Sequence, residues 1–305
     1  MRIVSLLSAA TEIVAALGMI DQLAGVSHEC DYPPEVNSKP RVTRCPIYGA
    51  GLSSNAVDRW VSETLAAGGD LYTLDVELLR ELAPDVILTQ QLCEVCSISA
   101  ATVTRALATL PRAPRMIELS PNCLADILQD IGRVAEALDV QDRGEALVTS
   151  LNARVDFVRD RTSQAASRPM CFLMEWIDPP YCSGHWSPEL VALAGGHDPL
   201  GRPGADSTRV SWESVLQARP EVIVAACCGW SVERTQQDLP ILEACPGWNS
   251  LSAVRAGRVH VVDGSAYFSR HGPRIADSLE ILAEILHPDL FAGCFPDRGA
   301  VRVGA

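Results

Sequence analysis

The sequence predicts an α/β fold in which parallel-type sheets form two similar lobes, with a ligand cleft between the lobes. The main observation is a repeat, because residues 75–88 are similar to residues 211–224 at an offset of 136 positions. Each copy begins with a residue suited to helix N-capping, carries a glutamate in the first helical turn and ends its helix at a proline. An uninterrupted run of apolar, mostly β-branched residues follows, which is typical of a strand buried in a parallel sheet. Two copies are too few for a solenoid, so they indicate two lobes, and the groove between lobes is a common ligand site.

Length and composition agree with two lobes. The chain has 305 residues and 48% hydrophobic residues, and domains of roughly 100–200 residues make two cores the default. The sequence therefore predicts four segments, namely an N-terminal α/β lobe at 1–142, a bridging helix at 143–166, a C-terminal α/β lobe at 167–288 and a tail at 289–305.

The N-terminal lobe is expected to begin at once with strand and helix. Residues 3–7 are apolar enough for a strand, Ser8 is a candidate N-cap, and residues 11–17 form a helix that Gly18 stops. Further elements are predicted as strands at 23–27 and 116–119, a helix at 58–67, and the strand of the first repeat copy, which ends near Gln90.

A helical pattern then extends from residue 124 to residue 166, with a break near 139–142. Its second half places Leu147, Leu151, Val155 and Val158 on one stripe. A helix of about 20 residues is roughly 30 Å long, which suits a single backbone helix that bridges the lobes. From Cys171 to about residue 286, strands and helices alternate again, so both lobes are expected to be Rossmann-like.

Charge and motifs exclude several classes of function. The formal net charge of −13 argues against nucleic-acid binding and against attraction to anionic membranes. No run approaches 18 apolar residues, so no transmembrane segment is expected. Because the sequence has no glycine-rich dinucleotide motif, phosphate loop or nucleophile elbow, nucleotide-binding and serine-hydrolase functions lack support.

The expected compartment is the cytoplasm. Glu12 interrupts the apolar N-terminal stretch, which therefore does not look like a signal peptide. Eleven cysteines, an odd number at irregular spacings, look like free thiols in a reducing compartment. A periplasmic or surface-anchored protein is the alternative if the true N-terminus is missing from the sequence.

The candidate ligand-binding residues follow the predicted strands, because ligands of parallel α/β sheets bind at the carboxyl ends of the strands. They include aromatic rings, imidazoles and thiols. The set is Ser8, His28, Glu29, Cys30, Gln90, Trp176, His185, Cys228, Trp230, Tyr267 and Arg270. For each cysteine the alternative is simple packing in the core, which is common for this residue type.

Cys93 and Cys96 form a Cys-x-x-Cys pair with two possible chemical roles and one structural one. The spacing fits half of a zinc site or a redox motif. No second pair completes a zinc site, although Cys30 or His28 could join the two thiols. A redox pair would need a helix N-terminus that lowers the thiol pKa, and packed core thiols are the third possibility.

Several segments resemble the class III periplasmic binding proteins, specifically the cobalamin-binding branch of ABC-transporter substrate-binding proteins. The resemblance covers residues 2–287, and the segments that carry it are Arg2–Leu6, Thr11–Glu12, Asp31–Pro34, Phe172–Gly184 and Pro273–Ile275. It implies two α/β lobes bridged by one long helix and a corrinoid, cobalamin or a close relative, held in the cleft.

The resemblance also implies roles for individual residues. Glu77 and Glu213 stand where the family has one glutamate on each lobe that docks onto arginines of an ABC permease. Tyr267 and Arg270 stand where an aromatic ring and an arginine line the cleft, whereas Gln90 replaces an expected aromatic residue.

Three functions remain possible at this point. The first is non-enzymatic cobalamin binding, as a transport component or a cytosolic relative, by a protein expected to be a monomer. The second is binding of another metal chelate, such as haem or a siderophore, or of a metal ion through Cys and His. The third is a thiol-dependent enzyme on the same fold. An anionic siderophore would favour a basic cleft, which this acidic chain does not indicate.

Overall fold

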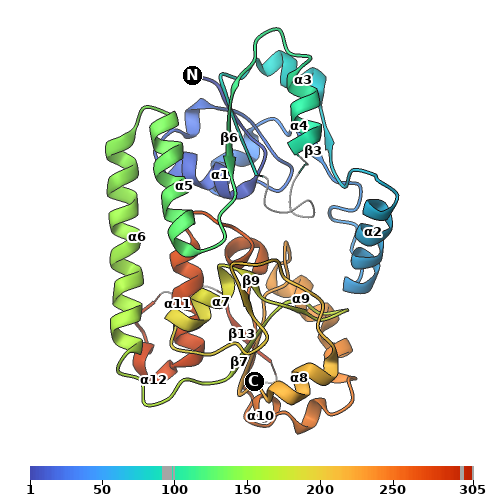
Figure 1. Ribbon diagram of the computed structural model, residues 1–305, viewed down its shortest axis with the longest axis vertical. Helices are drawn as coiled ribbons and strands as arrows, with labels where there is room; N and C mark the ends of the chain where they lie inside the picture. Colours follow the sequence, from blue (N-terminus) through green and yellow to red (C-terminus); the bar gives the residue numbers. More distant parts are fainter. Residues whose placement is uncertain (91–97, 99, 296–298, 304–305) are drawn as a thin grey trace. The chain divides into compact units, whose positions relative to one another are not determined.

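The computed structural model describes residues 1–90, 98, 100–295 and 299–303, and the chain divides into two compact units (Figure 1). Unit 1 comprises Met1–Leu52, Ala56–Pro121 and Asp126–Thr149. Unit 2 comprises Ser53–Asn55, Asn122–Ala125 and Ser150–Ala305. Within the described ranges, no helix has both the length and the apolar character needed to cross a membrane.

Unit 1 contains a four-stranded sheet in which every neighbouring pair is parallel. Its strand order is β2 (Leu23–Val26), β1 (Ile3–Ser5), β5 (Val86–Gln90) and β6 (Arg115–Leu119). All residues of β1 and β5 are buried, which is why these strands lack polar alternation. A short antiparallel pair, β3 (Thr43–Arg44) and β4 (Thr73–Leu74), accompanies this sheet. The helical segments are α1 (Ser8–Ala16), η1 (Ile20–Gln22), η2 (Pro34–Ser38), α2 (Ser54–Ala66), α3 (Val76–Leu82), α4 (Ala100–Leu107) and α5 (Leu124–Ala137). The first two residues of α2 and of α5 belong to unit 2.

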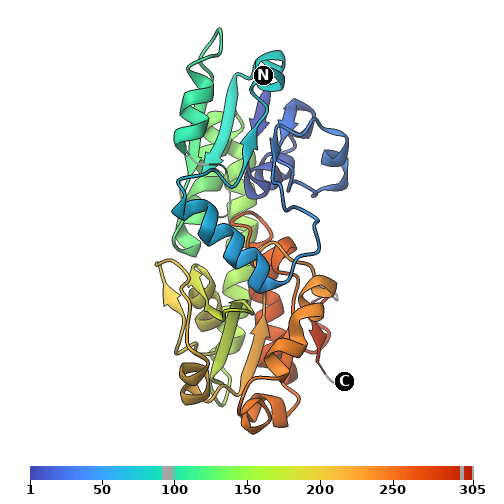
Figure 2. The same ribbon diagram turned by 90° about the vertical axis from the view of Figure 1, so that its right-hand side faces the viewer.

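Unit 2 is built around a five-stranded sheet with a parallel centre. Its order is β13 (Val301–Arg302), β12 (Val259–Val261), β11 (Val222–Ala225), β7 (Cys171–Trp176) and β8 (Tyr181–Cys182). The edge strands β8 and β13 are antiparallel to their neighbours, whereas β7, β11 and β12 are parallel. Figure 2 shows β7 in yellow-green beside β11 in orange. The other elements are the paired strands β9 (Gly184–His185) and β10 (Arg202–Pro203), and the helices α7 (Ser187–Leu193), α8 (Trp212–Ala218), α9 (Val232–Glu243), η3 (Trp248–Ser250), α10 (Ser252–Arg255), η4 (Gly264–Phe268), α11 (Ile275–Leu286) and α12 (Pro288–Phe291).

The long helix α6 (Gln141–Thr162) has 22 residues, of which the first part belongs to unit 1 and the rest to unit 2. The predicted stripe is confirmed for Leu151, Val155 and Val158, which are buried. In unit 1, α6 lies close to α5, because a Cβ on Gly144 would be 2.4 Å from the Cβ of Ala135. The predicted break between the two helices is thus confirmed at residues 138–140.

The two repeat copies have the same local structure. Asp75 accepts a hydrogen bond from the Leu78 amide at 3.0 Å, and Ser211 accepts one from the Ser214 amide at 3.1 Å. Both helices end in a left-handed residue that is not glycine, Ala83 with φ 41° and Arg219 with φ 48°. Each of these residues precedes a proline, which disfavours the right-handed helical conformation. The predicted α/β class with parallel strands is therefore confirmed.

The prediction for Ser8 needs a correction. Ser8 is the first residue of α1, and the N-cap position is Leu7, which has no side-chain cap. The Ser8 hydroxyl instead donates to the backbone oxygen of Glu29 at 3.1 Å. A tertiary contact to the segment after β2 has replaced the expected local one.

Candidate functional site

An aromatic pair lies at the carboxyl edge of the unit 2 sheet. Trp176 is the last residue of β7 and Trp230 follows β11, the parallel neighbour of β7. Their ring centroids are 4.4 Å apart with a 48° interplanar angle. The guanidinium carbon of Arg234 is 3.7 Å from the Trp230 centroid, within the range of a cation–π interaction. The sequence predicted both tryptophans as site residues but did not single out Arg234.

Tyr267 and Arg270 reach the same region of unit 2 from the end of β12. They lie in and just after η4, whose N-cap Asp263 accepts a hydrogen bond from the Ala266 amide at 2.7 Å. A Cβ on Gly264 would be only 2.1 Å from the backbone oxygen of Cys227. Only glycine therefore lets η4 approach the end of β11 so closely. Arg270 is buried and donates to the Ser265 hydroxyl at 3.4 Å.

Two partly buried carboxylates shape the loops beside β7. Glu175 accepts hydrogen bonds from the Gly184 amide at 3.1 Å and from the Ser207 hydroxyl. Asp198 accepts from the Ser183 hydroxyl at 2.7 Å and from the Gly201 amide at 3.0 Å. Burial raises the pKa of both carboxyl groups, although the hydrogen bonds act in the opposite direction. These groups hold the loop that presents His185.

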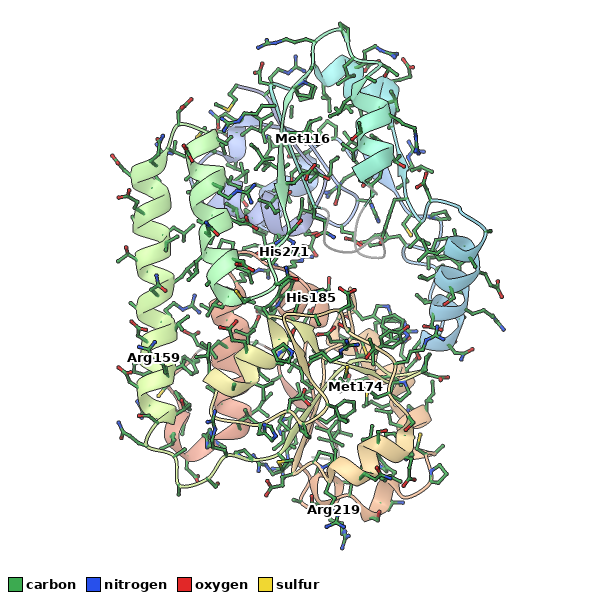
Figure 3. The ribbon with its side chains drawn as sticks, in the orientation of Figure 1. Met116, Arg159, Met174, His185, Arg219 and His271 are labelled. Carbon is green, nitrogen blue, oxygen red and sulfur yellow. The ribbon has the colours of Figure 1, made fainter. Side chains whose placement is uncertain are left out.

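His185 and His271, both labelled in Figure 3, each contact the ring of Trp186. Their ring centroids are 5.7 Å and 5.5 Å from that of Trp186. His185 adopts φ 49°, and its Nε2 is 3.7 Å from Oδ1 of Asp206. Burial lowers the pKa of His185, and it lowers the pKa of His271 to about 4. Both imidazoles are therefore neutral at neutral pH.

Unit 1 has an imidazole of its own at the end of its sheet. His28 follows β2, and its Nδ1 is 2.8 Å from the Thr43 hydroxyl oxygen. Its ring centroid is 5.0 Å from that of Tyr48 and 5.4 Å from that of Tyr72. Burial, followed by the charge of Arg41, lowers the pKa of His28 to about 4. The ring is thus neutral and enclosed by aromatic groups.

Of the remaining predicted residues of unit 1, Gln90 and Cys30 are buried, whereas Glu29 is partly exposed. Gln90 is 5% exposed at the end of β5, and Cys30 is 1% exposed. The Cys30 sulfur is 3.1 Å from the Thr11 hydroxyl oxygen and 3.3 Å from that of Ser27. The Glu29 carboxylate is 4.0 Å from Nε2 of His28.

The thiols of the described residues do not resemble a metal or redox centre. Among these residues, no three His, Cys, Asp or Glu side chains are grouped so that they could hold a metal ion. Burial raises the pKa of Cys171, and it raises the pKa of Cys227 to about 12. Both sulfurs therefore stay protonated and unreactive. Cys93 and Cys96 lie outside the described residues, whereas Cys228, beside Cys227, is partly exposed.

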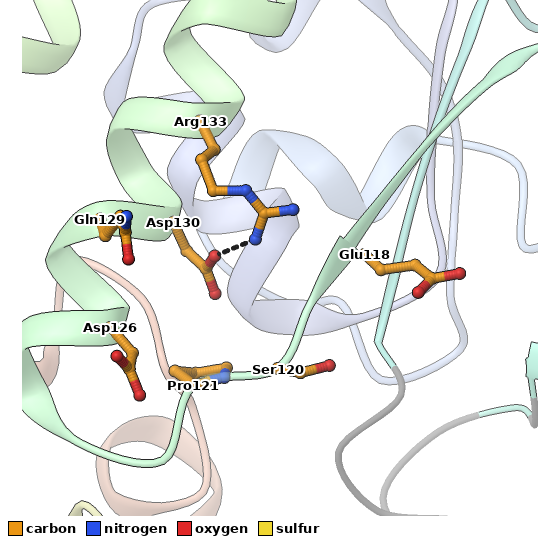
Figure 4. Close-up of a pocket in the computed structure, with 7 residues that line it drawn as sticks. All are labelled: Glu118, Ser120, Pro121, Asp126, Gln129, Asp130 and Arg133. Atoms are coloured by element: carbon orange, nitrogen blue, oxygen red, sulfur yellow. Dashed lines mark hydrogen bonds and ion pairs between the residues drawn. The ribbon is translucent and has the colours of Figure 1, made fainter.

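A cavity of about 410 Å³ lies in unit 1 beyond the end of β6 (Figure 4). Polar side chains dominate its lining, and Arg133 donates to the buried Asp130 carboxylate at 2.6 Å. The full lining is Glu118, Ser120, Pro121, Asp126, Gln129, Asp130 and Arg133. None of the predicted site residues is among them, and its three carboxylates and single guanidinium do not suit a large apolar ligand.

The two glutamates predicted to dock a permease are on the surface of their own units. Glu77 lies in the first turn of α3, where its side chain is 79% exposed and accepts from Arg80 at 2.7 Å. Glu213 lies in the first turn of α8, is exposed, and accepts from Gln217 at 3.1 Å. Both carboxylates are accessible for a partner.

Comparisons with known proteins give a consistent picture. The chain is 25% identical over 301 residues to the uncharacterized ABC transporter substrate-binding lipoprotein YvrC of Bacillus subtilis, covering 95% of this chain and 81% of that protein. It is 24% identical over 284 residues to the vitamin B12-binding protein of Vibrio cholerae, covering 92% and 86%. The periplasmic haem-binding protein RhuT of Roseiflexus has a similar fold, with a TM-score of 0.70, 22% identity and coverage of 95% and 98%.

The prediction of a cytoplasmic protein is wrong. The similar proteins are periplasmic or lipoprotein substrate-binding proteins, which points to the periplasm or the cell surface. The cysteine count misled the prediction because Cys30, Cys171 and Cys227 are buried, so free thiols here reflect core packing rather than compartment.

The resemblance seen in the sequence is confirmed by a direct match to a protein family. Residues 3–266 match the sequence model of that family, which consists of solute-binding proteins. With most of its length matched and with relatives that serve ABC transporters, the chain belongs to the periplasmic binding protein family.

Proposed function

We propose that this periplasmic binding protein binds cobalamin or a closely related corrinoid, without catalysing a reaction, and delivers it to an ABC permease. The aromatic pair Trp176 and Trp230 carries the proposal, together with Tyr267 and Arg270 at strand ends of the same sheet. A corrinoid is a large, flat and mostly apolar ring with amide groups at its edge. Such a ring suits aromatic walls with a few polar anchors. The similarity to vitamin B12-binding proteins supports this ligand.

Electrostatics favours a neutral ligand of this kind over a multiply anionic one. The chain carries a net charge of −13, which disfavours oxyanions and anionic chelates at long range. One similar protein is a molybdate-binding protein. Molybdate is small and doubly charged, so indole walls would contribute little to its binding.

Haem is the second candidate, because each unit has a neutral imidazole among its candidate residues. The lowered pKa values of His28 and His185 keep each imidazole neutral at neutral pH, with one ring nitrogen free of a proton, and neutral imidazole is a common axial ligand of haem iron. Haem-binding proteins occur among the structures of similar fold. The acidic net charge argues against haem, whose two propionates are anionic.

Titration calorimetry with cyanocobalamin, haemin and molybdate tests the proposal. We expect saturable heat with cyanocobalamin at one molecule per chain. Trp230→Ala should weaken binding by on the order of tenfold or more, because a stacked aromatic wall is lost. Trp212→Ala, which removes another half-buried tryptophan of unit 2, is the control and should retain affinity. If the folded protein gave heat with haemin but none with any corrinoid, the proposed ligand would be wrong and haem would take its place.

Two accompanying variants test the other proposed roles. Glu77→Gln combined with Glu213→Gln should leave corrinoid affinity unchanged and reduce uptake through the permease. Cys93→Ser combined with Cys96→Ser should leave cobalamin affinity unchanged. If the double variant lost a metal that the wild-type protein retains, this result would support the alternative in which the protein binds a metal ion.

A further inference from the structure

The tryptophan pair of unit 2 belongs to a closed ring of five contacts. Trp176 donates from Nε1 to the backbone oxygen of Ser54 at 3.1 Å, and the Ser54 amide donates to Oδ2 of Asp238 at 2.6 Å. Oδ1 of Asp238 accepts from Arg234 at 2.9 Å. The Arg234 guanidinium lies 3.7 Å from the centroid of Trp230, which in turn contacts Trp176. Each indole is thus held on one side by a polar group.

Asp238 also caps the N-terminus of α2, which is remote in sequence. Ser54 is the first residue of α2, so its amide has no acceptor within the helix. The carboxylate of Asp238 supplies that acceptor across 184 positions, where a local side chain usually does so. An anionic group also interacts favourably with the positive end of the helix dipole.

Two members of the ring, Ser54 and Asp238, are buried, and Asp238 is charged. Ser54 is fully buried and Asp238 is 6% exposed. Burial alone would raise the pKa of Asp238, but hydrogen bonds from Ser54 and Arg234 outweigh it and lower the pKa. Asp238 is therefore a stable anion that holds Arg234 over the indole of Trp230.

We propose that Arg234 and Asp238 are positioning residues that fix the orientation of Trp176 and Trp230 and tie this aromatic wall to the first residue of α2. The consequence for ligand affinity rests on the function proposed above. An indole that is already oriented loses less rotational freedom when a flat ligand stacks on it, so a fixed pair binds more tightly than a mobile one.

Asp238→Asn is the sharpest variant, because it keeps the shape of the side chain and removes its charge. Arg234→Gln removes the neighbouring member of the ring and leaves the carboxylate that caps α2 in place. Asp277→Asn is the matched control, since Asp277 is also a carboxylate of unit 2 paired with an arginine, Arg154. Variants are compared only if their unfolding midpoints in urea are similar, so that a general loss of stability does not explain the result.

Two readouts separate positioning from general stability. Indoles as close as 4.4 Å couple their transitions, so the pair should give an exciton couplet in far-ultraviolet circular dichroism. The couplet is compared in a Trp212→Ala background, because Trp212 and Trp248 also lie close, at 6.0 Å. The second readout is the Kd for cyanocobalamin. We expect Asp238→Asn and Arg234→Gln to reduce the couplet and to weaken binding by on the order of tenfold, whereas Asp277→Asn should change neither.

The couplet needs no ligand, so the positioning role and the proposed function can fail separately. If the wild-type protein bound no corrinoid, the proposed ligand would be refuted. Loss of the couplet in Asp238→Asn would still support the positioning role of Asp238. An unchanged couplet and unchanged affinity in both variants would overturn the proposal. If Asp238→Asn does not fold, Arg234→Gln decides by the same two criteria.

Discussion

Arg154 is expected to be a main attachment of α6 to the rest of unit 2, and Arg154→Met tests this. Its Nε and Nη2 donate to the two carboxylate oxygens of Glu280 on α11 at 2.8 and 2.6 Å, and it also pairs with Asp277. The side chain of Glu280 is 6% exposed and that of Asp277 is 16% exposed. Burial would lower the pKa of Arg154, but hydrogen bonds to these carboxylates raise it. Removing the guanidinium leaves both carboxylates buried without their cation.

The expected loss is about 3 kcal/mol in the free energy of unfolding. Breaking a buried ion pair by removing one partner costs roughly 3–5 kcal/mol, and the partial exposure of Arg154 places it at the low end. Adding Asp277→Asn and Glu280→Gln to Arg154→Met should recover much of this loss, because no uncompensated charge then remains.

Urea denaturation followed by circular dichroism measures the effect against a control on the same helix. Arg159 is 56% exposed and pairs with Asp156 at 2.8 Å, so Arg159→Met should cost about 0.5 kcal/mol or less. If the two variants lost the same stability within error, the buried pair would not attach α6 as inferred.

The other predictions concern pH, close approach and backbone conformation. Burial lowers the pKa of His28, His260 and His271 from 6.5 to about 4, so the unfolded chain binds more protons and stability falls as the pH drops from 6.5 towards 4. The contribution is up to about 1.4 kcal/mol per pH unit for each histidine. Thermal melts should show a shallower pH dependence for His260→Gln, and an identical slope would refute the assignment. Gly264→Ala should destabilise by about 1–3 kcal/mol, because its Cβ would meet backbone of Cys227, whereas Gly132→Ala, with open space around it, should gain about 1 kcal/mol. Equal effects of these two substitutions in urea melts would contradict the close approach. Ala83→Gly and Arg219→Gly should each stabilise by about 0.5–1 kcal/mol by relieving positive φ, whereas Ala146→Gly inside α6 should cost about 1 kcal/mol. If calorimetry showed that both Ala83→Gly and Arg219→Gly lower the stability, backbone strain at these positions would be refuted.

Local patterns explain why much of the fold was predictable. The buried strands β5 and β11, their preceding helices and the break before α6 each follow from runs, caps and periodicity within about 15 residues. The left-handed ends at Ala83 and Arg219 were not predicted, because neither is a glycine and the following proline acts through steric restriction.

The site was less predictable because its contacts join distant positions. Trp176 and Trp230 could be found since each follows a predicted strand, and ligands bind at such ends. Arg234 and Asp238 instead look like an ordinary polar helix face, and their partner Ser54 lies 184 positions before Asp238. Asp198 was not among the candidate residues, because its hydrogen bonds depend on the folded loops around it.

Hydrogen exchange with and without saturating cyanocobalamin tests the central claim most directly, since it reports binding and its location together. We predict slower amide exchange after the ends of β7, β11 and β12, in Trp176–Asp178, Cys227–Ser231 and Gly264–His271, with no change in α8 and α10. Unchanged exchange in all three segments in the presence of the corrinoid would contradict the account.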